Sequence, residues 1–338
     1  MKEALLSVKN LSTSFFTNNG EVQAVRDVSF DLHKGEILGI VGESGSGKSV
    51  TNFSIIRLLA DNARIKSGSV IYKGNDLTKI SMKKIRKIRG REISMIFQDS
   101  MTSLNPLMTV GKQVQEMLTI HFPEMKGKAG KKKVLELFEM VRIPEGKKRF
   151  DAYPHEFSGG MRQRALIAMS LACNPEILIA DEPTTALDVT IQDQILKLIK
   201  KLQDENGMSV IFITHDLAVV AETCSRVIVM YGGMIMEQAD INELFYRPLH
   251  PYTKGLMASL PDAGQLKSKE LKQIPGSPPD MLNPPAGCPF SPRCDEAMAI
   301  CRAGLPPLYE VSDSHYSRCW LLDPKAPLEN NPFAGYKG

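Results

Sequence analysis

The chain has 338 residues, enough for one large domain or two unequal ones, and its 43% of hydrophobic residues can build a full core. Its formal net charge is +4, from 42 basic and 38 acidic residues, which is too small to indicate nucleic-acid binding. No apolar stretch reaches the roughly 18 residues of a membrane span, and the first residues lack the apolar core of a secretory signal. We therefore expect a cytoplasmic protein that reaches a membrane only by docking onto partners.

Short apolar runs, taken in chain order, predict the strands of a mostly parallel sheet. The first run, residues 37–41, precedes a glycine-rich turn and then a helical pattern over residues 49–59. Further strands are expected over residues 93–97, 177–180, 209–214 and 227–231, and an amphipathic helix over residues 189–203. Strands that alternate with helices are typical of an α/β fold with crossover helices.

Two segments depart from this alternation. Residues 101–172 are mainly polar and helical in pattern, which suggests an inserted helical lobe. From about residue 236 the composition changes, and a run of prolines with a Gly-Ser-Pro-Pro breaker at residues 276–279 indicates a linker before a small tail domain. The tail contains four of the six cysteines, whereas Cys173 and Cys224 lie in apolar surroundings and are expected to be buried.

Residues 42–49 fit the phosphate-binding pattern G-x-x-x-x-G-K-[ST], between a predicted strand and a predicted helix. Its glycines allow backbone N–H groups to converge on phosphate oxygens, and the helix N-terminus adds a positive dipole end. Lys48 would reach the β- and γ-phosphates, and the Ser49 hydroxyl would ligate Mg²⁺. The loop comprises Gly42, Glu43, Ser44, Gly45, Ser46, Gly47, Lys48 and Ser49. By itself it does not separate kinases, GTPases, helicases and transporter ATPases.

A second motif selects among these classes. Residues 158–164, Ser-Gly-Gly-Met-Arg-Gln-Arg, resemble the signature sequence of ABC ATPases, with Met161 where glutamine is usual. A helix N-terminus there, formed by Ser158, Gly159 and Gly160, would present N–H groups and a hydroxyl to a γ-phosphate. In the family that phosphate belongs to the ATP held by the partner subunit. The predicted strand at residues 177–180 follows at the short interval typical of the family.

The resemblance implies the chemical roles of three further residues. Asp181 would hold Mg²⁺, usually through water, and Glu182 would polarise the attacking water as general base. His215, which follows the predicted strand at residues 209–214, would contact the γ-phosphate and help to hold the attack geometry. Glu182 and His215, together with Lys48, make up the expected catalytic set, and Asp181 is an expected Mg²⁺ ligand beside Ser49 and Gln98.

Three other positions match the family by place. Gln98 corresponds to the glutamine that senses Mg²⁺ and leads into the helical lobe. Residues 186–188, ending in Asp188, resemble the loop that crosses the ATPase dimer interface. Phe15 stands where an aromatic ring stacks on adenine, although the adjacent Phe16 is an alternative and a core aromatic is the plain structural interpretation.

The resemblance covers residues 5–240 and implies an α/β fold, the P-loop ABC nucleotide-binding domain. This domain, expected over residues 1–240, would have a RecA-like core, an N-terminal antiparallel β region and a helical lobe at about residues 100–172. Residues 241–338, here called the C-terminal extension, would form a small cysteine-rich domain.

Several segments resemble one branch of the family, the ATP-binding subunits of dipeptide and oligopeptide importers. They are residues 98–106, 250–253, 274–279, 287–294 and 318–319, and the signature variant resembles the D-type subunit. The branch pairs two different ATPases with two permeases and an extracytoplasmic substrate-binding protein. The chain is thus expected at the cytoplasmic membrane face, with residues 98–108 receiving a permease helix. Relatives in the branch carry nickel, glutathione or sugars, so the cargo stays open.

Cys288, Cys294, Cys301 and Cys319 are separated by five, six and seventeen residues, which is not the paired C-x-x-C of common zinc ribbons. In a reducing cytosol such a cluster indicates a metal site rather than disulfides. Four thiolates suit Zn²⁺ or a [4Fe–4S] cluster, and the family resemblance favours the iron–sulfur cluster. Unliganded or disulfide-linked cysteines remain a third possibility.

Two other functions compete with a transporter ATPase that uses ATP and Mg²⁺. A soluble ABC protein of DNA repair or translation would usually carry a coiled coil or two tandem ATPase domains, whereas this sequence has one phosphate-binding loop and no heptad run. The other is a regulatory iron–sulfur module that hydrolyses ATP incidentally. The complete catalytic set, which includes Glu182, argues against it.

Overall fold

The computed structural model describes residues 3–98, 103–184, 188–259 and 274–326. These fall into two compact units. The first contains the described residues of 1–5, 32–37 and 79–213, and the second those of 6–31, 38–78 and 214–338. Among the described residues, no helix combines the length and the apolar character that crossing a bilayer requires.

The first unit contains three parallel strands, β6 (Ile93–Ile96), β7 (Ile177–Asp181) and β8 (Ser209–Thr214), side by side in that order. Each of them lies within one residue of its predicted bounds. Every residue of β7 and β8 is buried, which explains why these strands read as unbroken apolar runs rather than as alternating patterns. The run of charged and apolar residues between them forms α7 (Val189–Asn206).

Helix α7 begins at its cap Asp188, whose side chain accepts a hydrogen bond from the Ile191 N–H over 2.9 Å. It extends beyond the predicted residue 203 and ends at Gly207, which adopts a left-handed φ of 63°. The buried face includes Ile195, Leu198 and Leu202, the positions that the sequence pattern places on one side.

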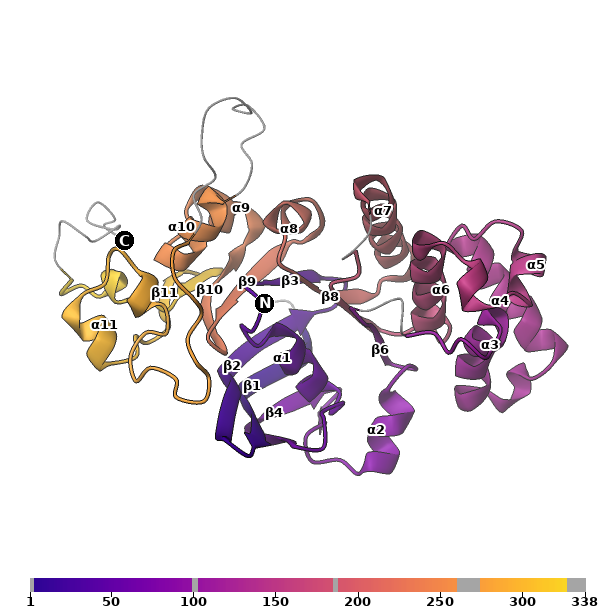
Figure 1. Ribbon diagram of the computed structural model, residues 1–338, viewed down its shortest axis with the longest axis horizontal. Helices are drawn as coiled ribbons and strands as arrows, with labels where there is room; N and C mark the ends of the chain where they lie inside the picture. The colour runs from indigo at the N-terminus through magenta and orange to yellow at the C-terminus, as the bar shows by residue number, and fades with distance from the viewer. Residues whose placement is uncertain (1–2, 99–102, 185–187, 260–273, 327–338) are drawn as a thin grey trace. The chain divides into compact units, whose positions relative to one another are not determined.

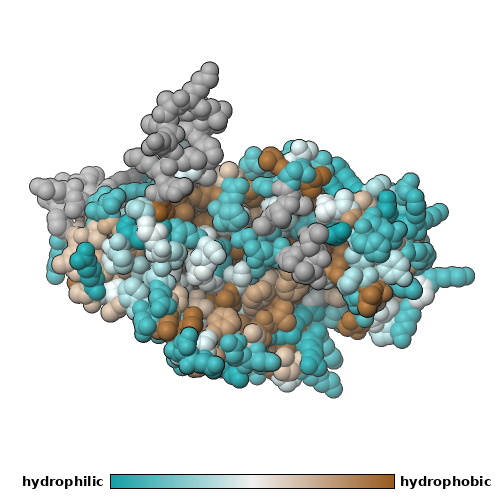
Figure 2. Space-filling view, viewed as in Figure 1, coloured by the Kyte–Doolittle hydropathy of each residue, from teal (hydrophilic) through white to brown (hydrophobic). Residues whose placement is uncertain are grey.

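The rest of the first unit is mainly helical, as the polar pattern before residue 172 predicts (Figure 1). Phe138, Val114 and Leu118 are fully or almost fully buried among these helices, and Gly111 lies where an added Cβ would meet the Phe150 ring at 2.4 Å. Hydrophilic residues dominate the viewed face over α4 and α5 (Figure 2). The elements are α2 (Met82–Ile88), α3 (Val110–His121), η1 (Pro123–Met125), α4 (Lys128–Met140), α5 (Gly146–Phe150), η2 (Pro154–Glu156) and α6 (Gly159–Leu171).

The second unit contains two sheets. One has the strand order β2 (Gly20–His33), β1 (Ala4–Thr17), β4 (Ala63–Tyr72) and β5 (Asn75–Asp76), and β1 pairs with β4 in antiparallel fashion. In the other, β3 (Ile37–Val41) pairs in parallel with β9 (Arg226–Tyr231), which the sequence predicts over residues 227–231. Helix α1 (Lys48–Ile55) follows β3 and is shorter than predicted, because Arg57 adopts a left-handed φ of 54°.

The sheet of the second unit continues into the C-terminal extension. Strand β10 (Met234–Asp240) pairs with β9 and with β12 (His315–Ser317), and β12 also pairs with β11 (Tyr309–Ser312). The fully buried Glu237 carboxylate of β10 accepts hydrogen bonds from the Leu249 and His250 N–H groups and contacts His315 Nε2 at 2.7 Å. The remaining elements are α8 (Leu217–Thr223), α9 (Ile241–Tyr246), α10 (Pro251–Ala258), η3 (Ser291–Arg293), α11 (Ala299–Ala303) and η4 (Trp320–Leu322).

Candidate functional site

The phosphate-binding loop follows the fully buried strand β3 and makes a turn that requires glycine at two positions. Gly42 has a φ of 153°, and an added Cβ would lie 2.2 Å from the Met230 carbonyl oxygen. Gly47 has a φ of 98°, and its Cβ would lie 2.4 Å from the Ala24 carbonyl oxygen. The loop backbone therefore packs directly on neighbouring backbone, which leaves its outer face for a ligand.

Lys48 opens helix α1 and is buried inside the loop. Its Nζ donates hydrogen bonds to the carbonyl oxygens of Gly42, over 2.7 Å, and Glu43, over 2.9 Å. Ser44 and Gly45 are exposed at the loop's tip, and Ser49 lies in the first turn of α1. A helix N-terminus with a lysine held at this place can bind the phosphates of a nucleotide.

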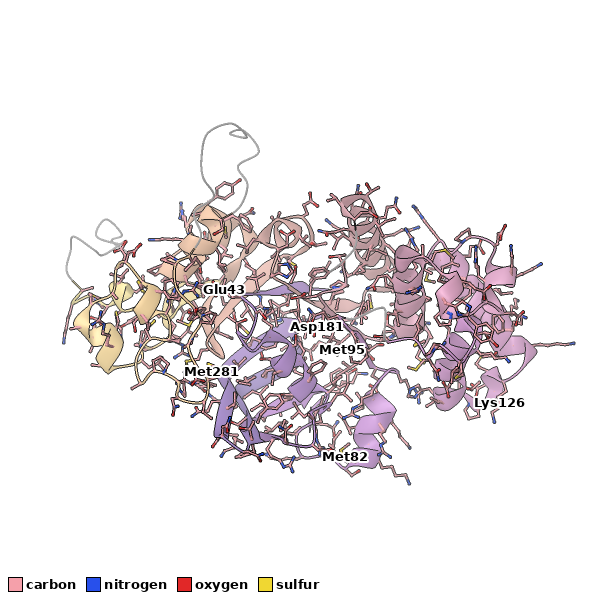
Figure 3. The ribbon with its side chains drawn as sticks, in the orientation of Figure 1. Glu43, Met82, Met95, Lys126, Asp181 and Met281 are labelled. Carbon is pink, nitrogen blue, oxygen red and sulfur yellow. The ribbon has the colours of Figure 1, made fainter. Side chains whose placement is uncertain are left out.

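The C-terminal extension contacts this loop through Glu43, a residue to which no motif of the sequence assigns a role and which Figure 3 labels. The Glu43 N–H donates to the Tyr252 hydroxyl over 2.9 Å, and two Arg293 nitrogens donate to the Glu43 carboxylate over 2.7 and 3.2 Å. Burial lowers the pKa of Arg293, but its hydrogen bonds to Glu43 and Tyr231 outweigh burial and leave that pKa above its ordinary value. Glu43 and Arg293 are 250 positions apart, so no local pattern could have joined them.

In the first unit, two acidic residues lie at the end of β7. Asp181 is 2% exposed, and Figure 3 shows it near Met95 of the neighbouring strand β6. Glu182 adopts a left-handed φ of 45°, and its N–H donates to the Ile213 carbonyl over 3.0 Å. Gln98 Nε2 donates to Glu182 Oε2 over 2.9 Å, so the structure brings together the expected Mg²⁺-sensing glutamine and the expected general base.

The signature segment begins α6 in the same unit. Ser158 caps the helix by accepting a hydrogen bond from the Met161 N–H over 3.3 Å, and Ser158 and Gly159 are exposed. At Gly160, an added Cβ would lie 3.0 Å from Ile191 Cγ2 of α7. The buried Gln163 donates to the Pro183 carbonyl over 2.6 Å, which ties the signature helix to the segment after Glu182.

The other expected site residues lie at three further elements. His215 is exposed and directly follows β8, and Asp188 caps α7. Residues 186–187 of the expected interface loop lie outside the described residues. Phe15 is partly exposed on β1, while the adjacent Phe16 is 44% exposed, with Lys66 Nζ 5.3 Å from its ring centroid.

Cys288, Cys294, Cys301 and Cys319 all line one pocket, here called the thiol pocket, together with His250 and Trp320. All four are free thiols, and the Cys288 N–H donates to the Cys301 carbonyl over 2.8 Å. Burial raises the pKa of Cys288 and of Cys319 to about 12, and that of Cys294 to about 11. Cys173 and Cys224 are buried elsewhere, as the sequence predicts.

The side chains that line the thiol pocket are of the kinds that suit a metal centre with thiolate ligands. His250 Nδ1 accepts a hydrogen bond from the Tyr252 N–H over 3.0 Å, so the neutral ring carries its proton on Nε2, which is buried and has no hydrogen-bond partner in the described chain. Across that part of the chain, no three His, Cys, Asp or Glu side chains already form a group that could hold a single metal ion.

Comparisons with known proteins agree on one family. Residues 25–185 match the family described as "ABC transporter", and residues 236–301 match "Oligopeptide/dipeptide transporter, C-terminal region". The chain is 54% identical over 331 residues to the oligopeptide transport ATP-binding protein OppD of Bacillus subtilis, covering 98% of this chain and 92% of that protein. It is 54% identical to the dipeptide transport ATP-binding protein DppD of the same organism, covering 96% of each. OppD of Escherichia coli is 49% identical, covering 94% of this chain and 93% of that protein.

A solved structure of the ATP-binding cassette MJ0796, a post-hydrolysis dimer bound to ADP and Pi, superposes with a TM-score of 0.64. It is 30% identical and covers 70% of this chain and 98% of that one. The fold is therefore the α/β P-loop fold of the ABC nucleotide-binding domain, with an added C-terminal region of the oligopeptide-transporter type. The chain belongs to the ATP-binding subunits of oligopeptide and dipeptide ABC transporters, and it is an ABC ATPase that couples ATP hydrolysis to transport.

Proposed function

We propose that this chain energises the import of di- and oligopeptides from the cytoplasmic face of the membrane, as one of two paralogous ATPases bound to two permeases. An extracytoplasmic binding protein would deliver the cargo. The observation that carries this proposal is the 54% identity to OppD and DppD of Bacillus subtilis over nearly the whole chain. Nickel, glutathione or a sugar is the alternative cargo, and a soluble ABC ATPase without a permease is the alternative function.

The experiment is reconstitution of the chain with its co-expressed partner ATPase and permeases in proteoliposomes that carry the binding protein. ATP-dependent uptake of labelled di- to hexapeptides is expected. Uptake of nickel, glutathione or a sugar in place of peptide would redirect the cargo assignment. Purification of an active ATPase that never associates with the permeases would overturn the transport role.

We assign the site residues as follows. Lys48 and the N–H groups of Gly42, Ser44, Gly45 and Gly47 bind the phosphates of Mg-ATP, and Ser49, Gln98 and Asp181 hold Mg²⁺. Glu182 activates water, and His215 contacts the γ-phosphate. Phe15 stacks on adenine. Ser158, Gly159, Gly160 and Asp188 act on the ATP of the paired subunit, because two ATPs lie between opposed phosphate-binding and signature segments in the closed dimer.

The proposed domain division is an ATPase domain over residues 1–240, with a helical lobe at about residues 100–172, followed by the C-terminal extension over residues 241–338. We assign the permease contact to residues 98–108, of which residues 99–102 lie outside the described chain. Leu107 supports this assignment, because it is 85% exposed and an apolar side chain so placed suits a partner surface.

For the thiol pocket we propose a [4Fe–4S] cluster held by Cys288, Cys294, Cys301 and Cys319. Support comes from four free thiols that share one pocket and from the unpartnered His250 Nε2 beside them. When bound, such a cluster supplies a rigid cross-link and a one-electron redox couple. The chain's own contribution is a buried shell that keeps water from the thiols and a proton on His250 Nε2 that can be donated to sulfur.

A further inference from the structure

We propose that Arg293 of the C-terminal extension is a positioning residue of the phosphate-binding loop, through which the extension sets the affinity for ATP. The proposal rests on the ATPase function above and adds a residue outside the motifs that define it. All residues that carry it lie in the second unit.

Arg293 uses each of its five N–H donors. Nε donates to the Pro275 carbonyl over 2.8 Å. Nη1 donates to Glu43 Oε2 over 2.7 Å and to the Tyr231 hydroxyl over 3.0 Å, and Nη2 donates to Glu43 Oε1 over 3.2 Å and to the Ile274 carbonyl over 3.0 Å. A planar guanidinium with five donors engaged has one orientation. Its side chain is only 6% exposed, so solvent screens the pair with Glu43 weakly.

Glu43 is the point where this network meets the nucleotide site. Its carboxylate is held by Arg293, its N–H donates to Tyr252, and its carbonyl accepts from Lys48 Nζ over 2.9 Å. A shift of Glu43 therefore moves both a backbone atom that Lys48 contacts and the loop that must wrap the phosphates. The rings of Tyr231, Tyr252 and Phe290 pack beneath the network, with centroids 4.6 to 5.4 Å apart.

The extension also packs against the end of β9, the strand that pairs with β3 beside the phosphate-binding loop. At Gly232, which follows β9, an added Cβ would lie 2.8 Å from Pro289 Cβ. This close packing and the forked ion pair hold the free loop near one conformation. A pre-ordered loop does not lose that conformational freedom when ATP binds, so affinity rises. Arg293 acts on the Glu43 carboxylate and not on Lys48 itself, so its loss is expected to weaken ATP binding far more than it slows the chemical step.

Arg293 ends η3 and is bonded directly to Cys294, which lines the thiol pocket. Because the two residues are consecutive, a change in the conformation of the thiol pocket at Cys294 would shift Arg293, which holds the Glu43 carboxylate. The extension in this way forms part of the nucleotide site rather than a separate appendage.

The test measures binding of a fluorescent ATP analogue to the full chain, and KM and kcat for ATP in the reconstituted transporter. The variants are Arg293→Met, Arg293→Lys, Glu43→Gln and the Arg293→Met/Glu43→Gln pair. Arg293→Met is expected to raise Kd and KM for ATP about tenfold, while kcat stays nearly unchanged. Arg293→Lys should restore only part of the affinity for ATP, because an ammonium group cannot form the two parallel hydrogen bonds that a guanidinium donates to a carboxylate. The double variant should have the same Kd and KM for ATP as the single variants, because either substitution alone already removes the Arg293–Glu43 ion pair.

The matched control is Arg318→Met, because Arg318 is a partly buried arginine of the extension that donates to the Ile235 and Pro306 carbonyls. It should lower the thermal midpoint but leave KM for ATP unchanged. Equal KM values in wild type and in both Arg293 variants, additive effects in the double variant, or the same KM rise in Arg318→Met would each overturn the proposal. Failure of the wild-type chain itself to bind the analogue would instead contradict the ATPase function.

Discussion

Gln98 and Glu182 share a hydrogen bond of 2.9 Å, from the amide Nε2 to the carboxylate Oε2. One residue follows β6 and the other follows β7, so the pairing of two adjacent parallel strands sets the position of the carboxylate. Glu182 also has a left-handed φ of 45°, which is unfavourable for a residue with a side chain and is typical of functional positions. The backbone and a neighbouring side chain thus aim the same carboxylate.

Replacing this carboxylate tests its role as general base. Glu182→Gln keeps the shape and removes the proton acceptor, so hydrolysis is expected to fall about 10²- to 10⁴-fold while ATP binding persists. Steady-state hydrolysis and equilibrium binding of ATP give the two readouts. Glu205→Gln, an exposed change on α7, serves as the control and should hydrolyse normally. Normal turnover in Glu182→Gln would remove Glu182 from the mechanism.

The hydrogen bond itself is tested at Gln98. Gln98→Ala removes the donor and frees the carboxylate to move, and loss of one hydrogen bond to a charged group should lower kcat about tenfold. Gln98→Glu places a like charge beside Glu182 and should lower kcat further. If both variants hydrolyse ATP at the wild-type rate, this contact does not position the base.

The assignment of the permease contact predicts a separation of hydrolysis from uptake. Leu107 is 85% exposed, so Leu107→Glu should leave the thermal midpoint and basal hydrolysis unchanged while uptake by the reconstituted transporter falls. Tyr246→Glu is the matched control, because Tyr246 is 83% exposed and lies in α9, outside the proposed contact. Normal uptake in Leu107→Glu would place the permease contact elsewhere.

Strands whose residues are all buried could be predicted closely from sequence. Apolar runs such as those of β3 and β8 leave few alternatives, and the glycine pattern at Gly42 and Gly47 follows from backbone that leaves no room for a Cβ. Helix ends were less predictable. Helix α1 stops four residues early because Arg57 adopts a left-handed conformation that no local sequence signal announces.

Contacts between distant residues were not predictable from one sequence. Arg293 was part of a recognised motif and Glu43 occupied a variable place in another, yet neither motif indicates their ion pair. The two residues are 250 positions apart, so their contact depends on the tertiary fold rather than on a local pattern. That the four cysteines line one pocket agrees with the clustering seen in the sequence, whereas their spacing fits no common metal motif and does not by itself indicate which metal they bind.

Two glycines of the extension differ in whether the structure leaves room for a side chain. A Cβ at Gly287 would lie 2.2 Å from the Cys301 carbonyl oxygen, whereas one at Gly304 would have Trp320 at 3.8 Å as its nearest neighbour. Gly287→Ala is therefore expected to separate Cys288 from Cys301 and to cost about 1–3 kcal/mol of stability, and Gly304→Ala to be nearly neutral. Thermal unfolding of the two variants checks this, and equal midpoints would contradict the packing described here.

The content of the thiol pocket is tested by anaerobic purification with iron, sulfide and zinc analysis and a visible spectrum. About four irons and four sulfides per chain are expected, with loss of colour in Cys288→Ser and Cys319→Ser but not in Cys173→Ser, which changes a buried cysteine outside the pocket. Because Arg293 adjoins Cys294, removal of the iron should also weaken binding of the ATP analogue in the wild type. In Arg293→Met that dependence should vanish, since the connection to Glu43 is already broken. Stoichiometric zinc, or no metal, would reject the cluster and leave the ATP site unchanged, whereas iron loss without any change in ATP affinity would confine the cluster to a structural role.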